Sequence, residues 1–227
     1  MTQTEQRTEE WYNIRHNMIT ASDVATALGV NKYQSINSLI KKKITEETKK
    51  SGGSFATNHG NKYEDEARFL FAERFKLETW EIGLFQHPTI SWLGGSPDGI
   101  ASDGNLIEIK CPVTREITHE IPSHYYPQVQ ICMEILDRPA CYFIQYKPSN
   151  YFQNGILDVQ IIKRSKEWFK ENLITLEKFW NKVLFMRENG FSKFDPKKII
   201  DLSMLEFPKL NNEPIYESES DEENNDY

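Results

Sequence analysis

The sequence lacks any apolar run that approaches the roughly 18 residues needed to cross a membrane. Its first residues, MTQTEQRTEEWYNIRHN, are polar and contain none of the apolar stretch of a secretory signal peptide. Charged residues make up 27% of the chain. We therefore expect a soluble, intracellular protein without membrane partners.

Cysteine is scarce, and several common catalytic patterns are absent. The three cysteines are widely spaced and form no CxxC pair (Cys111, Cys132 and Cys141). This favours reduced thiols over disulfides or a zinc site. The five histidines show no metal-ligand spacing. No phosphate-cradling glycine loop and no serine triad pattern occurs.

Positive charge is not in excess, since the net charge is −7 at pH 7. The tail EPIYESESDEENNDY, residues 213–227, holds seven acids and no base. This composition predicts a disordered acidic tail. Without the tail the chain carries no net charge, so a local basic surface for nucleic acid is compatible with the composition. We interpret the basic run KKKITEETKK, residues 41–50, as a solvated helix end rather than a DNA contact.

Apolar periodicity predicts one α/β domain over residues 1–212. The helix within ITASDVATALGV is expected to be capped by Ser22 and to stop at Gly29. GSFATNHG, residues 53–60, is interpreted as a loop. Further helices are expected at 5–16, in SINSLIKKK, at 61–76, at 123–137 and at about 165–187. Strands are expected in TWEIGLFQH, TISWLGG, DGIAS, LIEIKC, ACYFIQYK and ILDVQII.

The segment LGGSPDGIASDGNLIEIKCP, residues 93–112, places ionisable groups in strand-like sequence, where they are disfavoured. In NLIEIK, the alternation puts Glu108 and Lys110 on one face of a strand. The turn signal SDG indicates that Asp98 and Glu108 lie on paired antiparallel strands.

The length of the turn decides whether the two carboxylates meet. A two-residue loop would pair Asp98 with Ile109 and send the carboxylates to opposite faces. A three-residue loop at 102–104, with Gly104 at positive φ, pairs Asp98 with Glu108 instead.

Two adjacent carboxylates repel each other unless a cation lies between them, and oxygen ligands suit Mg²⁺ or Mn²⁺. Such an ion polarises a phosphoryl oxygen and makes water more acidic. Lys110 is placed to orient that water or to stabilise charge in the transition state. An exposed hairpin with ordinary solvated charges is the alternative interpretation, and spacing alone does not choose between them.

Four blocks of sequence favour the metal site over the exposed hairpin. They are W(x)3R(x)3ITASD from Trp11 to Asp23, GNKYEDEAR from Gly60 to Arg68, the hairpin, and YYPQVQICM from Tyr125 to Met133. With the strand CYFIQYKP they span residues 11–147. Together they resemble the YqaJ-type viral recombination nucleases, a lambda-exonuclease-like family of PD-(D/E)xK nucleases. No family motif is found beyond about residue 165.

The resemblance implies a restriction-endonuclease-like core, a mixed central β-sheet flanked by helices. It also implies Mg²⁺-dependent hydrolysis of double-stranded DNA from a 5′ end in viral or phage recombination. Matched by position, the metal-binding acids are Asp98, Glu108 and Glu64. Lys110 and Gln128 complete the catalytic set. The DNA-binding residues are Arg15 and Ser22, for a terminal 5′-phosphate, and Tyr125 nearby.

Plain structural roles exist for several of these residues. Glu64 is also a helix-surface acid four residues before Arg68. Gln128 is also a polar helix residue, and Ser22 is also a helix cap. His59 and His124 lie near the matched blocks, and DNA contact is an open alternative to the surface or core roles that we favour for both.

Partners implied by the resemblance are DNA ends, a single-strand annealing protein and two further copies in a ring trimer. The expected compartment is the cytoplasm of the host or infected cell. An endonuclease or nickase of the same fold is the main alternative. A non-catalytic DNA-end-binding protein is a second one, although it would have no need of Asp98, Glu108 and Lys110 together.

Overall fold

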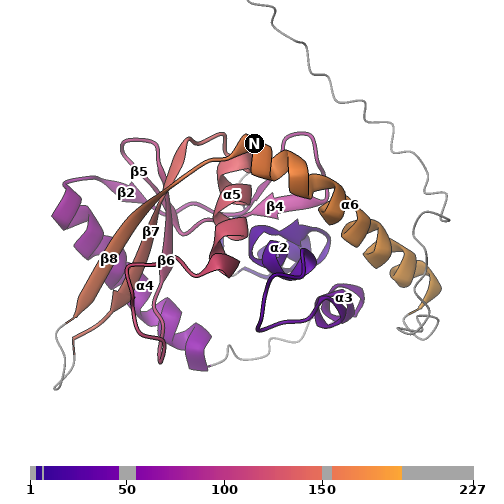
Figure 1. The fold of residues 1–227 in the computed structure, drawn as a ribbon, viewed down its shortest axis with the longest axis horizontal. Helices are drawn as coiled ribbons and strands as arrows, with labels where there is room; N and C mark the ends of the chain where they lie inside the picture. Colours follow the sequence, from indigo (N-terminus) through magenta and orange to yellow (C-terminus); the bar gives the residue numbers. More distant parts are fainter. Residues whose placement is uncertain (1–3, 7, 46–54, 150–154, 191–227) are drawn as a thin grey trace, which may run out of the picture. The chain divides into compact units, whose positions relative to one another are not determined.

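The computed structural model describes residues 4–6, 8–45, 55–149 and 155–190. Its larger sheet has five strands in the order β2-β5-β6-β7-β8 (Figure 1). β6 and β7 are parallel, and the other neighbours are antiparallel. The crossover that a parallel pair requires carries helix α5. The strand bounds are Thr79–Trp80 (β2), Gly99–Ala101 (β5), Leu106–Lys110 (β6), Ala140–Lys147 (β7) and Ile156–Lys163 (β8).

A smaller sheet has the order β1-β4-β3, with β1 parallel and β3 antiparallel to β4. Its strands are Ile19–Thr20 (β1), Phe85–Gln86 (β3) and Leu93–Gly95 (β4). Gly94 permits this close pairing, because a Cβ there would lie 2.2 Å from Sδ of Met18. β4 is followed within a few residues by β5 of the larger sheet. Asp98 lies in this short connection.

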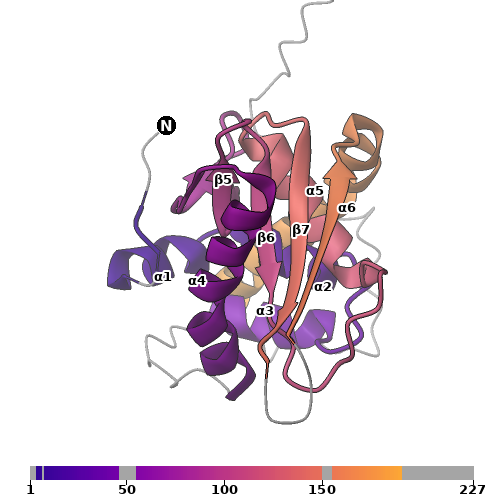
Figure 2. The same ribbon diagram turned by 90° about the vertical axis from the view of Figure 1, so that its left-hand side faces the viewer.

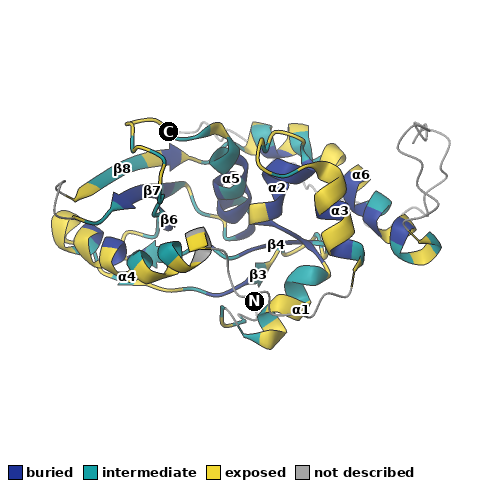
Figure 3. Cartoon of the chain, turned by 90° about the horizontal axis from the view of Figure 1, so that it is seen from below, coloured by how far each residue is buried: buried dark blue, intermediate teal, exposed yellow. Residues whose placement is uncertain are grey.

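Helices cover both faces of the central strands β6 and β7 (Figure 2). Ile107 and Ile109 of β6 pack with Phe71 of α4 in one apolar cluster. The intervening Glu108 instead meets Gln128 of α5. The helices are Glu9–His16 (α1), Ala21–Ala27 (α2), Ile36–Ile44 (α3), Phe55–Phe75 (α4), Tyr126–Ile135 (α5) and Lys166–Asn189 (α6), with a 3₁₀ turn at Ser123–Tyr125 (η1). Figure 3 shows α2 largely buried and the outward face of α4 exposed.

Two of the helix predictions are wrong in detail. Residues 55–60 of the predicted loop are helical, because α4 starts at Phe55. The rings of His59 and Tyr63, one turn apart, lie 4.7 Å from each other and favour this extension. Gly60 is tolerated within the helix but gives a misleading loop signal.

The cap of α2 is Thr20 rather than Ser22. The carboxylate of Asp23 accepts hydrogen bonds from the backbone N–H of Thr20 at 3.2 Å and from its hydroxyl at 2.6 Å. Such a capping box satisfies a free donor at the helix start. Ser22 is thus already inside the helix. The predicted stop is confirmed, since Gly29 follows α2 with a φ of +75°.

The long C-terminal helix is confirmed at Lys166–Asn189. The acidic tail at 213–227 lies outside the described residues, so its disorder and the extent of the domain to residue 212 stay predictions. No helix in the described ranges combines the length and the apolar character that a membrane crossing requires.

One lysine of the basic run is not solvated as expected. Lys43 is only 3% exposed and forms an ion pair of 2.8 Å with Asp23. Its ammonium also donates to the carbonyl oxygens of Arg15 and Met18, both at 2.7 Å. Arg187 of α6 donates to the carbonyl oxygen of Lys43 at 2.7 Å. These bonds fix the segment between α1 and α2.

Burial alone would raise the pKa of Asp23, but attraction to Lys43 and Arg15 outweighs it and holds the pKa at about 2. Burial also lowers the pKa of Lys43, which Asp23 only partly offsets. We take the pair as ionised, because the two charges are in contact and the remaining donors of Lys43 are bound to carbonyls.

Replacing Lys43 by Met tests this pair. Removing one partner of a buried ion pair costs roughly 3–5 kcal/mol. We expect urea unfolding at pH 7 to show a loss of that size for Lys43→Met, and about 0.5 kcal/mol or less for the exposed neighbour in Lys42→Met. Because the pKa of Asp23 is depressed, the pair's contribution is present above about pH 4 and disappears as the pH falls toward 2. Equal losses in the two variants would contradict a stabilising pair.

Candidate active site

The hairpin has the register that brings the two acids opposite each other. Gly99 pairs with Ile107 and Ile100 pairs with Leu106, which sets Asp98 across from Glu108. Gly104 has a φ of +85°, and its N–H donates to the carbonyl of Ala101 at 2.8 Å. The predicted three-residue loop is therefore confirmed.

Glu108 is the buried member of the site, with 1% of its surface exposed. Lys110 and Gln128 both donate hydrogen bonds to its Oε1 atom. Its Oε2 atom is also buried and has no hydrogen-bond partner within the described part of the chain. A buried carboxylate oxygen without a donor is costly, so this atom is the natural position for a cation.

Charge within the site is unbalanced. Burial raises the pKa of Glu108 and the nearby charge of Asp98 adds to the rise, while Lys110 opposes it, which leaves the pKa at about 8. Burial would lower the pKa of Lys110, but attraction to Glu108 and Asp98 raises it above its usual value. Asp98 accepts a hydrogen bond from the backbone N–H of Ile109 at 2.7 Å. Two acids thus share one lysine.

Glu64 approaches this pair from α4, but Arg68 holds it. The guanidinium of Arg68 donates to Oε1 of Glu64 at 3.1 Å and to the carbonyl oxygen of Asp98 at 3.3 Å. The alternative role, a one-turn ion pair, is therefore formed in the structure. Among residues whose placement is described, no group of three or more His, Cys, Asp or Glu side chains is arranged to hold a metal ion. The donor set that fits an ion is the oxygen pair of Glu108 and Asp98.

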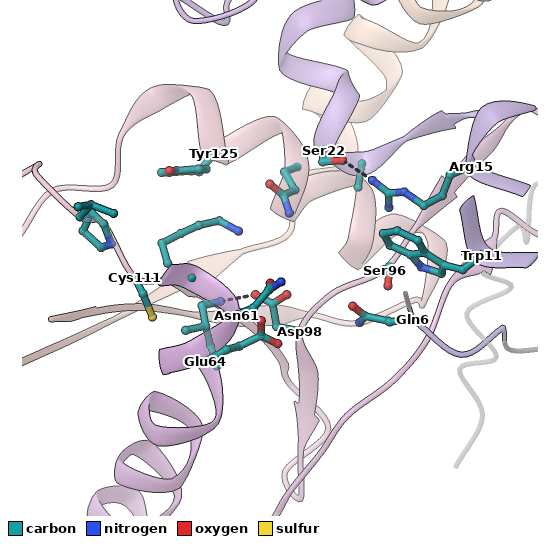
Figure 4. Close-up of a pocket in the computed structure, with 17 residues that line it drawn as sticks. Gln6, Trp11, Arg15, Ser22, Asn61, Glu64, Ser96, Asp98, Cys111 and Tyr125 are labelled. Atoms are coloured by element: carbon teal, nitrogen blue, oxygen red, sulfur yellow. Dashed lines mark hydrogen bonds between the residues drawn. The ribbon is translucent and has the colours of Figure 1, made fainter. Parts of the chain in front are cut away.

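A cavity of about 390 Å³ joins these residues to Arg15 and Ser22. All the predicted site residues line it except Glu108, which lies behind Lys110 and Gln128. Figure 4 shows Glu64 and Asp98 on one side and the Arg15–Ser22 pair on another. The lining residues from the prediction are Arg15, Ser22, Glu64, Asp98, Lys110, Tyr125 and Gln128.

The Arg15 guanidinium is held in place before any ligand binds. It donates to the hydroxyl of Ser22 at 3.0 Å and lies 4.0 Å from the ring of Trp11. Burial lowers the pKa of Arg15, while Asp23 opposes the change. An anion entering the cavity would meet a positioned guanidinium and a hydroxyl, which together suit a phosphate.

Three residues that line the cavity were not among the predicted site residues, namely Gln6, Trp11 and Ser96. Gln6 donates to the carbonyl oxygens of Ile82 and Pro97 at 2.8 and 3.1 Å and braces the connection that ends at Asp98. Nε1 of Trp11 and Oγ of Ser96 are buried without a partner in the part of the chain that the structure describes. Trp11 belongs to a matched block, whereas the contacts of Gln6 depend on the fold.

The cysteines are free thiols, as expected. Cys132 and Cys141 are buried, whereas Cys111 is half-buried and lines the cavity. Burial raises the pKa of Cys111 to about 12, and the acids Glu64 and Asp98 add to the rise. A thiol that stays protonated is a poor nucleophile, so Cys111 forms part of the cavity wall.

Comparison with known proteins identifies the family. A model of the YqaJ-like viral recombinase domain matches residues 10–138. The chain belongs to this family. It is 30% identical over 171 residues to an uncharacterized protein of Acanthamoeba polyphaga mimivirus, covering 66% of this chain and 30% of that protein. An African swine fever virus protein is 30% identical over 157 residues, covering 56% of this chain and 45% of that protein. The chain spans less than half the length of these relatives.

Two solved structures of similar fold are described as exonucleases. The alkaline exonuclease LHK-Exo of Laribacter hongkongensis has 28% identity and a TM-score of 0.65, covering 80% of this chain and 95% of that chain. A phage-related exonuclease of Haemophilus somnus has 15% identity and a TM-score of 0.56, covering 76% of this chain and 97% of that chain. The second likeness is one of fold alone. The predicted PD-(D/E)xK core, a mixed sheet flanked by helices, is confirmed.

The raised pKa of Glu108 predicts an unusual dependence of stability on pH. Because the folded-state value of about 8 exceeds the ordinary 4.5, the protein loses stability as the pH rises between these values. Glu108→Gln has no such proton to lose. We compare the free energies of unfolding of the variant and the wild type in EDTA. The variant's value minus the wild-type value should increase by on the order of a few kcal/mol from pH 5 to pH 8.5.

Denaturant unfolding at both pH values measures this difference. The exposed Glu177 of α6 provides the control, because Glu177→Gln should follow the wild type at each pH. Glu108→Gln and wild-type stabilities that run parallel from pH 5 to 8.5 would show that Glu108 ionises normally in the folded protein.

Proposed function

We propose that this protein is a metal-dependent deoxyribonuclease that digests double-stranded DNA from a 5′ end during viral or phage DNA recombination. The observation that carries the proposal is the buried Oε2 atom of Glu108, which has no hydrogen-bond partner among the described residues. It lies behind Lys110 and Gln128, which line the cavity together with Asp98 and a positioned Arg15. Membership of the YqaJ-like family supports the reaction class. So does 28% identity to a protein described as an alkaline exonuclease.

Glu108 and Asp98 are the residues that would hold Mg²⁺ or Mn²⁺, through carboxylate oxygens that both ions prefer. A bound ion would withdraw electron density from a phosphoryl group and favour deprotonation of the attacking water. Glu64 is the third acid at the cavity. Its Oε1 atom is bonded to Arg68, which has Asp65 and Glu81 as other partners.

Lys110 acts as a hydrogen-bond donor in this proposal, because its raised pKa keeps the ammonium protonated. Located between Glu108 and the ring of Tyr125, it can turn toward a phosphoryl oxygen and stabilise developing charge. Gln128 shares Oε1 of Glu108 with it. Its amide keeps the carboxylate oriented and offers a second neutral group for water or phosphate.

Selection of a DNA end is assigned to Arg15 and Ser22. A terminal phosphate carries more charge than an internal one and leaves more oxygens free for a guanidinium. Arg15 is already oriented by Ser22 and by the ring of Trp11, so little ordering is required on binding. Ser22 lies within α2, which has only seven residues. The proposal therefore rests on the side chains of Arg15 and Ser22 and not on the start of that helix.

The remaining expectations stay predictions. These are the ring of three copies, the annealing partner, the choice of Mg²⁺ over Mn²⁺ and the cytoplasmic location. An endonuclease or nickase shares the same metal-binding residues. It differs in having no use for a terminal phosphate, so the behaviour of closed circles separates the two.

We expect linear duplex to be digested only with Mg²⁺ or Mn²⁺, and closed circular duplex to resist. A hydrogen bond to a charged group is worth roughly 1.5–3 kcal/mol, so removing the 5′-phosphate or making Arg15→Ala should slow digestion about 10- to 100-fold. The two changes should not add, since they delete one contact. Lys110→Met should lose at least ~100-fold on every substrate.

Digestion rates of wild type and Arg15→Ala are measured on phosphorylated and on dephosphorylated ends. These four rates show the size of each effect and whether the two effects add. Arg74→Ala, which removes an arginine at the far end of α4, is the matched control and should digest both ends as wild type does. Efficient nicking of circles together with equal rates on all linear ends would contradict end-dependent digestion and favour the endonuclease.

A further inference from the structure

A row of aromatic rings leads from the catalytic lysine to the protein surface. The ammonium of Lys110 lies 5.4 Å from the ring of Tyr125. The ring of Tyr125 lies 4.1 Å from that of His124, which meets the ring of Tyr33 edge to face at 5.3 Å with an interplanar angle of 80°, so that each ring presents its own face. Tyr33 is 70% exposed, although large aromatic side chains gain most from burial. Tyr33 and His124 lie beyond the residues that line the cavity.

Two separate segments supply these rings and hold them in place. Tyr33 lies between α2 and α3, where its backbone N–H donates to the side chain of Asn31 at 2.9 Å. Asn31 in turn donates to Thr26 of α2 at 2.9 Å. Tyr125 ends the η1 turn and packs on Phe143 of β7 at 5.5 Å. The row is therefore attached to the central sheet at one end and to α2 at the other.

The surroundings of the row are positively charged. The ammonium of Lys32 lies 5.3 Å from the ring of Tyr33. Burial lowers the pKa of His124, and the positive charges of Lys32, Arg115 and Lys110 lower it further. The imidazole is consequently neutral at pH 7, in a positive field. Aromatic rings within a positive field are the combination that binds single-stranded nucleic acid, because bases stack while cations attract phosphates.

We propose that Tyr33 and His124 form a stacking platform for the bases of unpaired nucleotides at the DNA end, next to the reacting nucleotide. This inference rests on the proposed function and extends it to the substrate beyond the cavity. An unpaired base is required, since bases inside a duplex have no free face for a ring. The platform would bind frayed or separated ends more tightly than fully paired ones.

Binding of duplexes labelled with 2-aminopurine tests the platform in EDTA, where no hydrolysis occurs. One duplex is fully paired, and the other has four unpaired nucleotides at its 5′-phosphorylated end, with the fluorescent base among them. The variants are Tyr33→Ala, Tyr33→Phe and His124→Ala. Phe69→Ala is the control, because Phe69 is 64% exposed but lies on α4.

We expect Tyr33→Ala and His124→Ala to raise the Kd for the unpaired end roughly 5- to 100-fold, the range for loss of one base–ring stack. The Kd for the fully paired end should change less than about twofold. Tyr33→Phe retains the ring and should bind as wild type does, as should Phe69→Ala. Wild type should quench 2-aminopurine at the unpaired end, and Tyr33→Ala should lose that quenching.

Failure of the platform is distinguishable from failure of the proposed function. Wild-type digestion of linear duplex, together with unchanged binding of the unpaired end by Tyr33→Ala, would overturn the platform alone. So would equal loss in Phe69→Ala. A wild-type protein that neither binds nor digests either duplex with Mg²⁺ or Mn²⁺ would overturn both. Circular dichroism melting of each variant excludes loss of folding as the cause.

Discussion

Burial of one carboxylate in the middle of the sheet is the constraint on which the site depends. The strand β6 alternates between Ile107 and Ile109, which pack against α4, and Glu108, which faces α5. The strand is held by this apolar face, so Glu108 stays buried, with 1% of its surface exposed. Lys110 and Gln128 donate to one of its oxygens, and the other has no hydrogen-bond partner among the described residues. The apolar core therefore holds an acid with an unpaired oxygen, and that oxygen is where we propose that a cation binds.

The Arg15 end of the cavity depends on a second buried charge. Lys43 binds Asp23 and the carbonyl oxygen of Arg15, and so connects α3 to the segment that carries the guanidinium. Arg187 of α6 ties the same region to the C-terminal helix. Lys43, Asp23 and Arg187 thus help to position the Arg15 end of the cavity without lining it. The short connection from β4 to β5 then sets Asp98 at the same cavity.

Local signals predicted the geometry of the hairpin, while the catalytic and metal-binding roles of its residues stay predictions. Gly104 fixed the loop length, and the loop length fixed the register of Asp98 and Glu108, because side chains alternate along a strand. The matched blocks also grouped Arg15 and Ser22 with Lys110 in one site, and the three residues line the same cavity. These features depend on a few neighbouring residues, and sequence patterns describe such features directly.

Features set by distant contacts were missed. Lys43 is one of three consecutive lysines, and nothing in that run distinguishes the one that meets Asp23. Thr20 and Ser22 are both good caps, and the choice between them follows from where β1 ends. The i+4 partner of Glu64 was foreseen as an alternative. That Arg68 also binds the carbonyl of Asp98 follows from the packing of α4.

The central claim is that a divalent ion binds Oε2 of Glu108 together with the carboxylate of Asp98. Anomalous diffraction from crystals grown with Mn²⁺ tests it most directly, with Glu108→Gln crystals as the control. The expected result is a peak about 2.0–2.3 Å from oxygens of both acids in the wild type, and a much weaker peak or none in the variant. A wild-type map without a peak there, or with Mn²⁺ bound elsewhere while Oε2 of Glu108 stays unpartnered, would contradict the claim.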